Sequence, residues 1–149
     1  MIKRAAGRDA GRLTAMVRGS RAYEGPYAPM VADYLVTADY IERHRVFLAT
    51  DDTADDGDRL LGFYALVLDP PELDLMFVAD HAQGSGLGRR LVEHMKGEAR
   101  AAGLERVKVV SHPPVEGFYR SVGAERVGTV PAVLPKINWE RPELAFPIR

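Results

Sequence analysis

The sequence of 149 residues contains no cysteine, which excludes disulfides, thiolate metal sites and a cysteine nucleophile. It has no apolar run near the roughly 20 residues of a membrane-spanning helix, and Met1 to Ala5 carry no apolar core of a signal peptide. Lys and Arg total 20 against 21 Asp and Glu, so the net charge of −1 favours neither a nucleic-acid partner nor a membrane partner. We therefore expect a cytoplasmic protein.

Hydrophobic residues make up 46% of the chain, which is enough for a substantial core. The length suits one domain, and we expect a single domain over residues 1–149. Apolar periodicity and turn residues predict seven strands, at 2–5, 46–50, 60–68, 73–78, 107–110, 124–130 and 144–148. The same patterns predict helices at 9–20, with Asp9 as N-cap, and at 30–42, 86–102 and 114–121.

The helix at 86–102 has the clearest apolar periodicity, and Gly103 is a natural stop. It lies between the apolar strand at 73–78 and the strand at 107–110. A strand, helix and strand in this order form a βαβ unit with a parallel pair. The prediction is therefore an α/β fold with a mixed sheet of about seven strands flanked by helices.

A glycine-rich loop, Gln83-Gly84-Ser85-Gly86-Leu87-Gly88, separates that apolar strand from the helix. Glycines leave the backbone N–H groups uncovered, and a helix N-terminus adds partial positive charge, so this loop predicts an anion or phosphate site. A dinucleotide fingerprint would need glycine where Arg89 stands, and a P-loop would need Gly-Lys-Ser/Thr, which is absent. A tight turn before a helix is the alternative.

The Gln-x-x-Gly-x-Gly pattern after an apolar strand resembles the coenzyme A motif of the GNAT superfamily of N-acetyltransferases. Val78 ends that strand at the usual spacing, and Phe118 to Ala124 is similar to the family's Phe-Tyr-x-x-x-Gly-Phe segment. The resemblance implies a splayed parallel central strand pair and acetyl-CoA as cosubstrate, with no metal. Two positions depart from the family pattern, because Asp80 replaces a common proline and His112 replaces a common asparagine.

The resemblance also implies which residues contact the cosubstrate. The expected contacts are Met76, Phe77, Val78, Gln83, Gly84, Ser85, Gly86, Leu87, Gly88, Arg89, His112 and Tyr119.

Acyl transfer to an amine needs a base, since only about 4 in 10,000 lysine-like amines are neutral at pH 7. Glu72 and Asp74 stand two apart on a strand and share one face, and the resemblance implies that one of them is the general base. The sequence leaves open which of these two carboxylates is the base. The resemblance also makes Tyr119 the acid that protonates the departing thiolate. The absence of cysteine excludes an acyl-cysteine intermediate, which favours direct attack of the acceptor on the donor.

The acceptor is expected to be a small-molecule or peptide amine. In this family the segments at 23–34 and 131–142 wall the acceptor site, which suggests Tyr23, Glu24, Tyr27 and Trp139 as substrate contacts. Two alternatives stay open: a non-catalytic acyl-CoA-binding or sensing module, and a nucleotide-binding interaction domain. A homodimer is also left open.

Overall fold

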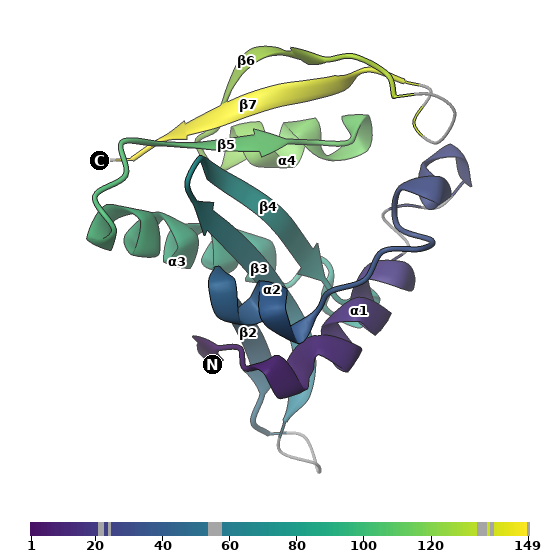
Figure 1. Cartoon of the computed structure of the whole chain (residues 1–149), viewed down its shortest axis with the longest axis vertical. Helices are drawn as coiled ribbons and strands as arrows, with labels where there is room; N and C mark the ends of the chain where they lie inside the picture. Colours follow the sequence, from purple (N-terminus) through teal and green to yellow (C-terminus); the bar gives the residue numbers. More distant parts are fainter. Residues whose placement is uncertain (21–22, 24, 54–57, 134–136, 138, 149) are drawn as a thin grey trace.

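The computed structural model describes residues 1–20, 23, 25–53, 58–133, 137 and 139–148. Across these residues one sheet has seven strands in the order β1-β2-β3-β4-β5-β7-β6 (Figure 1). The strands are β1 (Ile2–Arg4), β2 (Arg45–Asp51), β3 (Arg59–Leu68), β4 (Pro71–Val78), β5 (Arg106–Val110), β6 (Glu125–Val130) and β7 (Arg141–Pro147). The predicted mixed sheet of about seven strands is confirmed.

The pairing of β4 and β5 divides the sheet into two parts. Every other neighbouring pair is antiparallel, whereas β4 and β5 are parallel and share a single register pair, Glu72 with Lys108. Beyond that pair the two strands diverge, and Figure 1 shows β5, β7 and β6 turning away from β2 to β4. The crossover from β4 to β5 runs through α3 (Leu87–Ala101), so the predicted βαβ unit is also confirmed.

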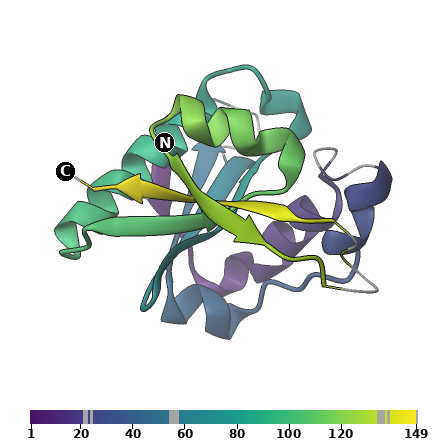
Figure 2. The same ribbon diagram turned by 90° about the horizontal axis from the view of Figure 1, so that it is seen from above.

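Helices cover both faces of the sheet and create two cores (Figure 2). On one face α1 (Ala10–Arg18) and α2 (Ala38–Arg43) bury Leu13, Val17 and Ile41 against β2, β3 and β4. On the other face α3 and α4 (Glu116–Ser121) form the larger core. No helix in the described part of the chain is long and apolar enough to cross a membrane.

A bulge in β4 places the predicted carboxylates. Leu66 pairs with Leu73 and Ala65 with Leu75, which leaves Asp74 as the extra residue. Leu73 consequently packs in the core beside α3, whereas Leu75 packs in the core beside α1. Asp74 accepts a hydrogen bond from the Tyr40 hydroxyl of α2 at 2.5 Å, so its carboxylate lies on the α2 face of the sheet.

The helix predicted at 30–42 is confirmed only over its last part, and its predicted start is wrong. A 3-10 helix covers Gly25–Met30, and α2 begins only at Ala38. The side chain of Thr37 caps α2 by accepting the Tyr40 N–H at 3.0 Å, which explains where the helix starts. Upstream, the Val36 N–H donates to the Thr14 hydroxyl of α1 at 2.9 Å, which holds this stretch extended across α1.

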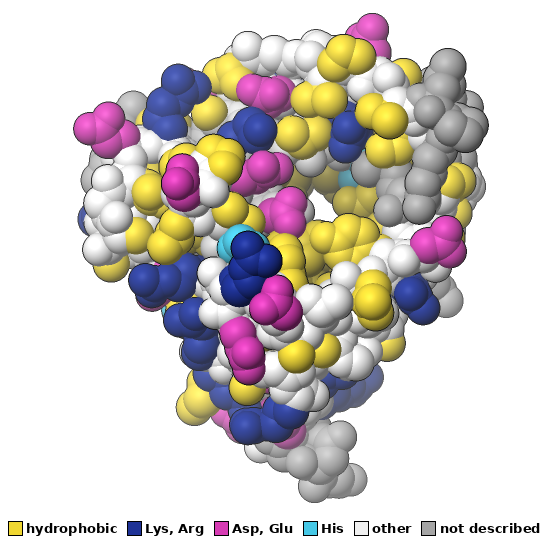
Figure 3. All heavy atoms as spheres, viewed as in Figure 1, with side chains coloured by type: hydrophobic (Ala, Val, Ile, Leu, Met, Phe, Trp, Pro, Cys, Tyr) yellow, Lys and Arg dark blue, Asp and Glu magenta, His cyan; other side chains and the backbone are white. Residues whose placement is uncertain are grey.

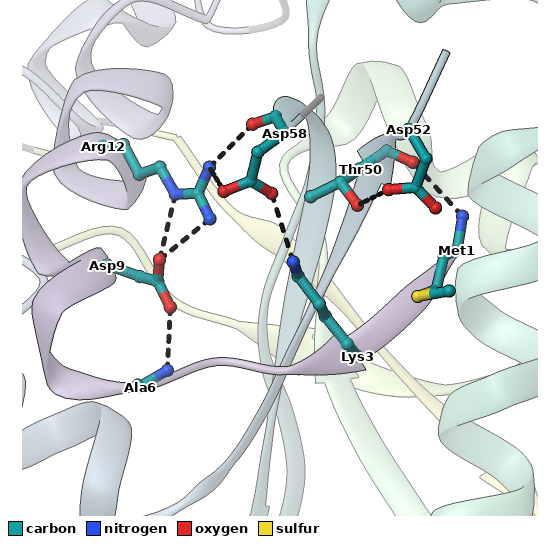
Figure 4. Close-up of polar contacts among 8 residues, drawn as sticks. All are labelled: Met1, Lys3, Ala6, Asp9, Arg12, Thr50, Asp52 and Asp58. Carbon is teal, nitrogen blue, oxygen red and sulfur yellow. Dashed lines mark hydrogen bonds and ion pairs between the residues drawn. The ribbon is translucent and has the colours of Figure 1, made fainter. Parts of the chain in front are cut away.

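A polar network fixes the start of α1 at the lower end of the sheet (Figure 4). The Asp9 carboxylate accepts the Ala6 N–H at 2.8 Å and pairs with Arg12 at 2.9 Å. Arg12 also donates to the Asp58 carbonyl, and Lys3 donates to the Asp58 carboxylate. Asp9 therefore occupies the predicted N-cap position of α1, but its side chain binds Ala6 and Arg12 and makes no cap hydrogen bond to a backbone N–H of α1.

Candidate active site

The glycine loop takes a conformation that favours glycine at two positions. Gly84 and Gly86 have φ of 78° and 83°, in the left-handed region that other residues rarely adopt. A Cβ at either position would meet no heavy atom within 4 Å, so open space borders this backbone. Gly86 directly precedes α3, whose first-turn N–H groups have no partner within the helix and carry partial positive charge. The loop thus has the geometry of an anion site.

Two side-chain hydrogen bonds brace the loop. The Gln83 side-chain amide donates to the carbonyl of Val78 at 3.0 Å, which ties the loop to the end of β4. The Ser85 hydroxyl donates to the Ala82 carbonyl at 2.6 Å, so this side chain turns back into the loop. Gly88 packs under α4, because a Cβ there would lie 3.1 Å from the Phe118 ring.

A cavity of about 370 Å³ extends from this loop into the gap between β4 and β5. Its size is within the range of small-molecule sites, which runs from about 300 to 1,000 Å³. Every predicted cosubstrate contact except Ser85 lines it. These residues are Met76, Phe77, Val78, Gln83, Gly84, Gly86, Leu87, Gly88, Arg89, His112 and Tyr119. Ser20, Tyr23, Ala82, Val115, Phe118 and Ser121 complete the lining.

A row of aromatic rings crosses the gap between β4 and β5. Tyr23 stacks on Phe77 of β4 at 5.6 Å and on His112, just after β5, at 4.0 Å. Phe77 also stacks on Phe63 at 5.8 Å. On the other side Tyr27 contacts His112 edge-on at 5.5 Å, and Trp139 contacts Tyr27 at 4.8 Å. We call these six residues the aromatic row.

Tyr119 reaches the cavity from α4 and is 8% exposed. Its ring packs edge-on against Phe118 and Phe146. Burial raises the pKa of the Tyr119 hydroxyl, and the nearby Tyr23 raises it further. Tyr119 is therefore a neutral phenol at pH 7, able to donate a proton. Burial likewise raises the pKa of Tyr23 to about 12.

Two carboxylates of β4 lie near α2 and outside the cavity lining. Glu72 lies beside Lys108 of β5 at 3.8 Å, and its side chain is 25% exposed. Desolvation raises the pKa of Glu72, Asp74 and Glu143 raise it further, and Lys108 lowers it. Neither Glu72 nor Asp74 lines the cavity. In the space-filling view acidic side chains lie along one side of a hollow, and hydrophobic side chains border part of the remaining rim (Figure 3).

A family model described as an acetyltransferase (GNAT) domain matches residues 37–131. The chain belongs to the GNAT family of acetyltransferases. Its family uses acetyl-CoA as the acetyl donor. No curated protein matches this GNAT chain significantly in sequence.

Solved structures share the fold of this GNAT acetyltransferase over nearly its whole length. A GCN5-related N-acetyltransferase from Rhodopseudomonas palustris is similar with a TM-score of 0.79 at 15% identity, over 99% of this chain and 94% of that chain. The ribosomal-protein-S18-alanine N-acetyltransferase from Escherichia coli gives 0.70 at 18% identity, over 99% and 93%. An aminoglycoside 6'-acetyltransferase type Ii gives 0.71 at 20% identity, over 100% and 97%. At these identities the likeness shows the fold.

The remaining predicted residues of this GNAT acetyltransferase lie in different places. Tyr23 lines the cavity, whereas Tyr27 and Trp139 belong to the aromatic row and do not line it. Glu24 lies outside the described residues. The part of the chain that the structure describes has no group of three or more His, Asp or Glu side chains placed to hold a metal ion.

The sequence did not single out Tyr40 or Lys108, which contact the two carboxylates. Tyr40 comes 34 residues before Asp74, and no local pattern links them. Phe118 belongs to the quoted motif, and its contact with Gly88 could have been anticipated only from the packing of α4 on α3.

Proposed function

We propose that this protein transfers an acetyl group from acetyl-CoA to an amine by direct attack, with Glu72 as general base and Tyr119 as general acid. The observation that carries the proposal is that the glycine loop and Tyr119 line the same cavity. An anion site and a neutral proton donor therefore border one space.

The residues present fit acetyl-CoA. The open backbone at Gly84 and Gly86, the start of α3 and Arg89 suit the pyrophosphate. Met76, Val78 and Leu87 supply apolar surface for the rest of the molecule. Bound acetyl-CoA would supply a thioester as acyl donor and a thiolate as leaving group.

Glu72 is the better candidate for the base. Its raised pKa makes it a stronger proton acceptor than an ordinary glutamate, and that pKa lies closer to neutral pH. Asp74, in contrast, is exposed, and its carboxylate already accepts the Tyr40 hydroxyl. Because Glu72 does not line the cavity, we propose that it takes the amine proton from the α2 side, directly or through one water.

Tyr119 is proposed to donate its proton to the departing thiolate. The hydroxyl is buried and neutral at pH 7, and it borders the same cavity as the glycine loop. An unperturbed thiol has a pKa of about 8.5, which is lower than the pKa of the Tyr119 hydroxyl. Proton transfer from Tyr119 to the thiolate therefore contributes modestly to the rate rather than providing a large driving force.

The acceptor is proposed to be a small-molecule or peptide amine that approaches from the α2 face. Glu72, Asp74 and Glu143 give that face negative charge, which attracts an ammonium group. Tyr27 and Trp139 are proposed to line the acceptor site. The Trp139 indole N–H is buried and meets no hydrogen-bond acceptor among the described residues. Among the structural neighbours, one is named for a protein's alanine and another for an aminoglycoside.

The test is thiol release from acetyl-CoA in the presence of a panel of amines, alcohols and thiols. The proposal predicts release that depends on an amine and yields the N-acetylated product. Turnover with alcohols or thiols alone would contradict it. Binding of acetyl-CoA without release for any acceptor would favour the non-catalytic module instead.

A further inference from the structure

Three stacked rings of the aromatic row border the cavity at the gap between β4 and β5. Tyr23, Phe77 and His112 all line the cavity, and they come from three separate segments of the chain. Tyr23 is the central ring, with Phe77 on one side and His112 on the other. It thereby bridges the two strands where they have diverged.

The stack is firmly held. Phe77 is 6% exposed and His112 is 2% exposed, so the two outer rings are fixed in the protein interior. The rings meet Tyr23 at interplanar angles of 28° and 25°, an offset-stacked arrangement with favourable energy. Phe63 supports Phe77 from behind, and Tyr27 supports His112. Tyr23 consequently cannot swing aside without breaking contacts on both faces.

The position of Tyr23 relative to the proposed chemistry is also defined. The glycine loop at 84–88 would hold the phosphates, and Tyr119 would lie at the thioester. Tyr23, Phe77 and His112 line the same cavity as Tyr119. The rings stack between the end of β4 and the residue that follows β5, so they border the cavity at the gap between these strands. An acyl group longer than acetyl would run into this wall.

We propose that Tyr23 is an acyl-length selector, whose ring closes the acyl end of the cavity and restricts the donor to acetyl-CoA. This inference rests on the proposed function, and it assigns Tyr23 to the donor side of the reaction rather than to the acceptor wall. One added methylene that a well-packed apolar site cannot accept changes kcat/KM by about 10- to 200-fold.

The experiment compares acetyl-, propionyl-, butyryl- and hexanoyl-CoA with one fixed amine. For the unmodified protein we expect kcat/KM to fall by about tenfold or more per added methylene. In Tyr23→Ala the ratio of butyryl-CoA to acetyl-CoA turnover should rise by about 10- to 200-fold. Tyr23→Phe is the matched control, because it keeps the ring and removes only the hydroxyl, and its ratio should equal that of the unmodified protein.

Two results would overturn the inference: equal use of acetyl- and butyryl-CoA by the unmodified protein, or an unchanged ratio in folded Tyr23→Ala. If Tyr23→Ala does not fold, Tyr23→Leu decides, with an intermediate rise expected and an unchanged ratio contradicting the inference. Calorimetric affinities for the same acyl-CoA series separate the two proposals. Absence of transfer to every amine would contradict the proposed function. A lower affinity for butyryl-CoA than for acetyl-CoA would still support Tyr23 as the residue that limits acyl length.

Discussion

The cavity side of the site is lined by glycine backbone, apolar side chains and aromatic rings. Glu72, Asp74 and Glu143 lie outside that lining, and we call this acidic group the α2 side because Asp74 contacts Tyr40 of α2. The cavity side draws most of its lining from one contiguous stretch, residues 76–89. The α2 side is assembled from β4, β5, β7 and α2, which meet only in the folded sheet. We therefore expect donor binding to be a local property of the chain and acceptor chemistry to depend on the tertiary fold.

This difference predicts that variants on the two sides affect separate kinetic quantities. Changes on the α2 side should alter turnover and the response to the amine, with little effect on coenzyme A affinity. Changes in the glycine loop should weaken coenzyme A binding first.

The largest effect is expected for Glu72→Gln. Loss of a general base should lower kcat by about 10²- to 10⁴-fold, while coenzyme A affinity measured by calorimetry stays unchanged. In the unmodified protein the base works only when ionised, so kcat/KM should rise with pH through the raised pKa of Glu72 and be lost below it. That acid limb should disappear in Glu72→Gln, and its persistence would remove Glu72 from the base role.

Tyr119→Phe should have the next largest effect. The phenylalanine preserves the packing against Phe118 and Phe146 but cannot donate a proton. We expect kcat to fall by about 10²-fold, the lower end of the range for general acids, because a thiolate leaves readily. Coenzyme A affinity should not change, and an unchanged kcat would exclude Tyr119 as the acid.

Gly86→Ala tests the donor side. Placing a side chain at φ of 83° costs about 1 to 2 kcal/mol, although the added Cβ meets no neighbouring atom. We expect coenzyme A affinity to weaken by about tenfold if the loop changes conformation to relieve that strain. Gly97→Ala within α3 is the matched control, since its Cβ also meets nothing, and it should stabilise the helix by about 0.5 to 1 kcal/mol. Equal destabilisation of both variants in urea unfolding would contradict this account.

Asp74→Asn should have the smallest effect. The amide still accepts the Tyr40 hydroxyl, and an exposed charge contributes less than about 1 kcal/mol. The KM for the amine should rise no more than about fivefold, with kcat nearly constant. A kcat loss as large as that of Glu72→Gln would transfer the base role to Asp74.

The sequence predicted the seven strands and the parallel pair because these depend on local periodicity. The resemblance to the family predicted most of the cavity lining, but not Ser20, Ala82, Val115, Phe118 and Ser121. The sequence failed for the start of the helix predicted at 30–42, where Thr37 starts α2 late and the preceding stretch is held by Thr14, 22 residues away from Val36. The aromatic row could not be predicted either. Its rings come from β3, β4, the segment after α1, the end of β5 and the β6–β7 connection, and no sequence spacing encodes their stacking.

The most direct test of the central claim measures amine-dependent thiol release and coenzyme A affinity side by side, in the unmodified protein and in Glu72→Gln. We predict N-acetylation by the unmodified protein, and in the variant a loss of turnover with unchanged affinity for coenzyme A. Loss of turnover together with an equal loss of affinity, or full turnover in the variant, would contradict the separation of donor binding from acceptor chemistry.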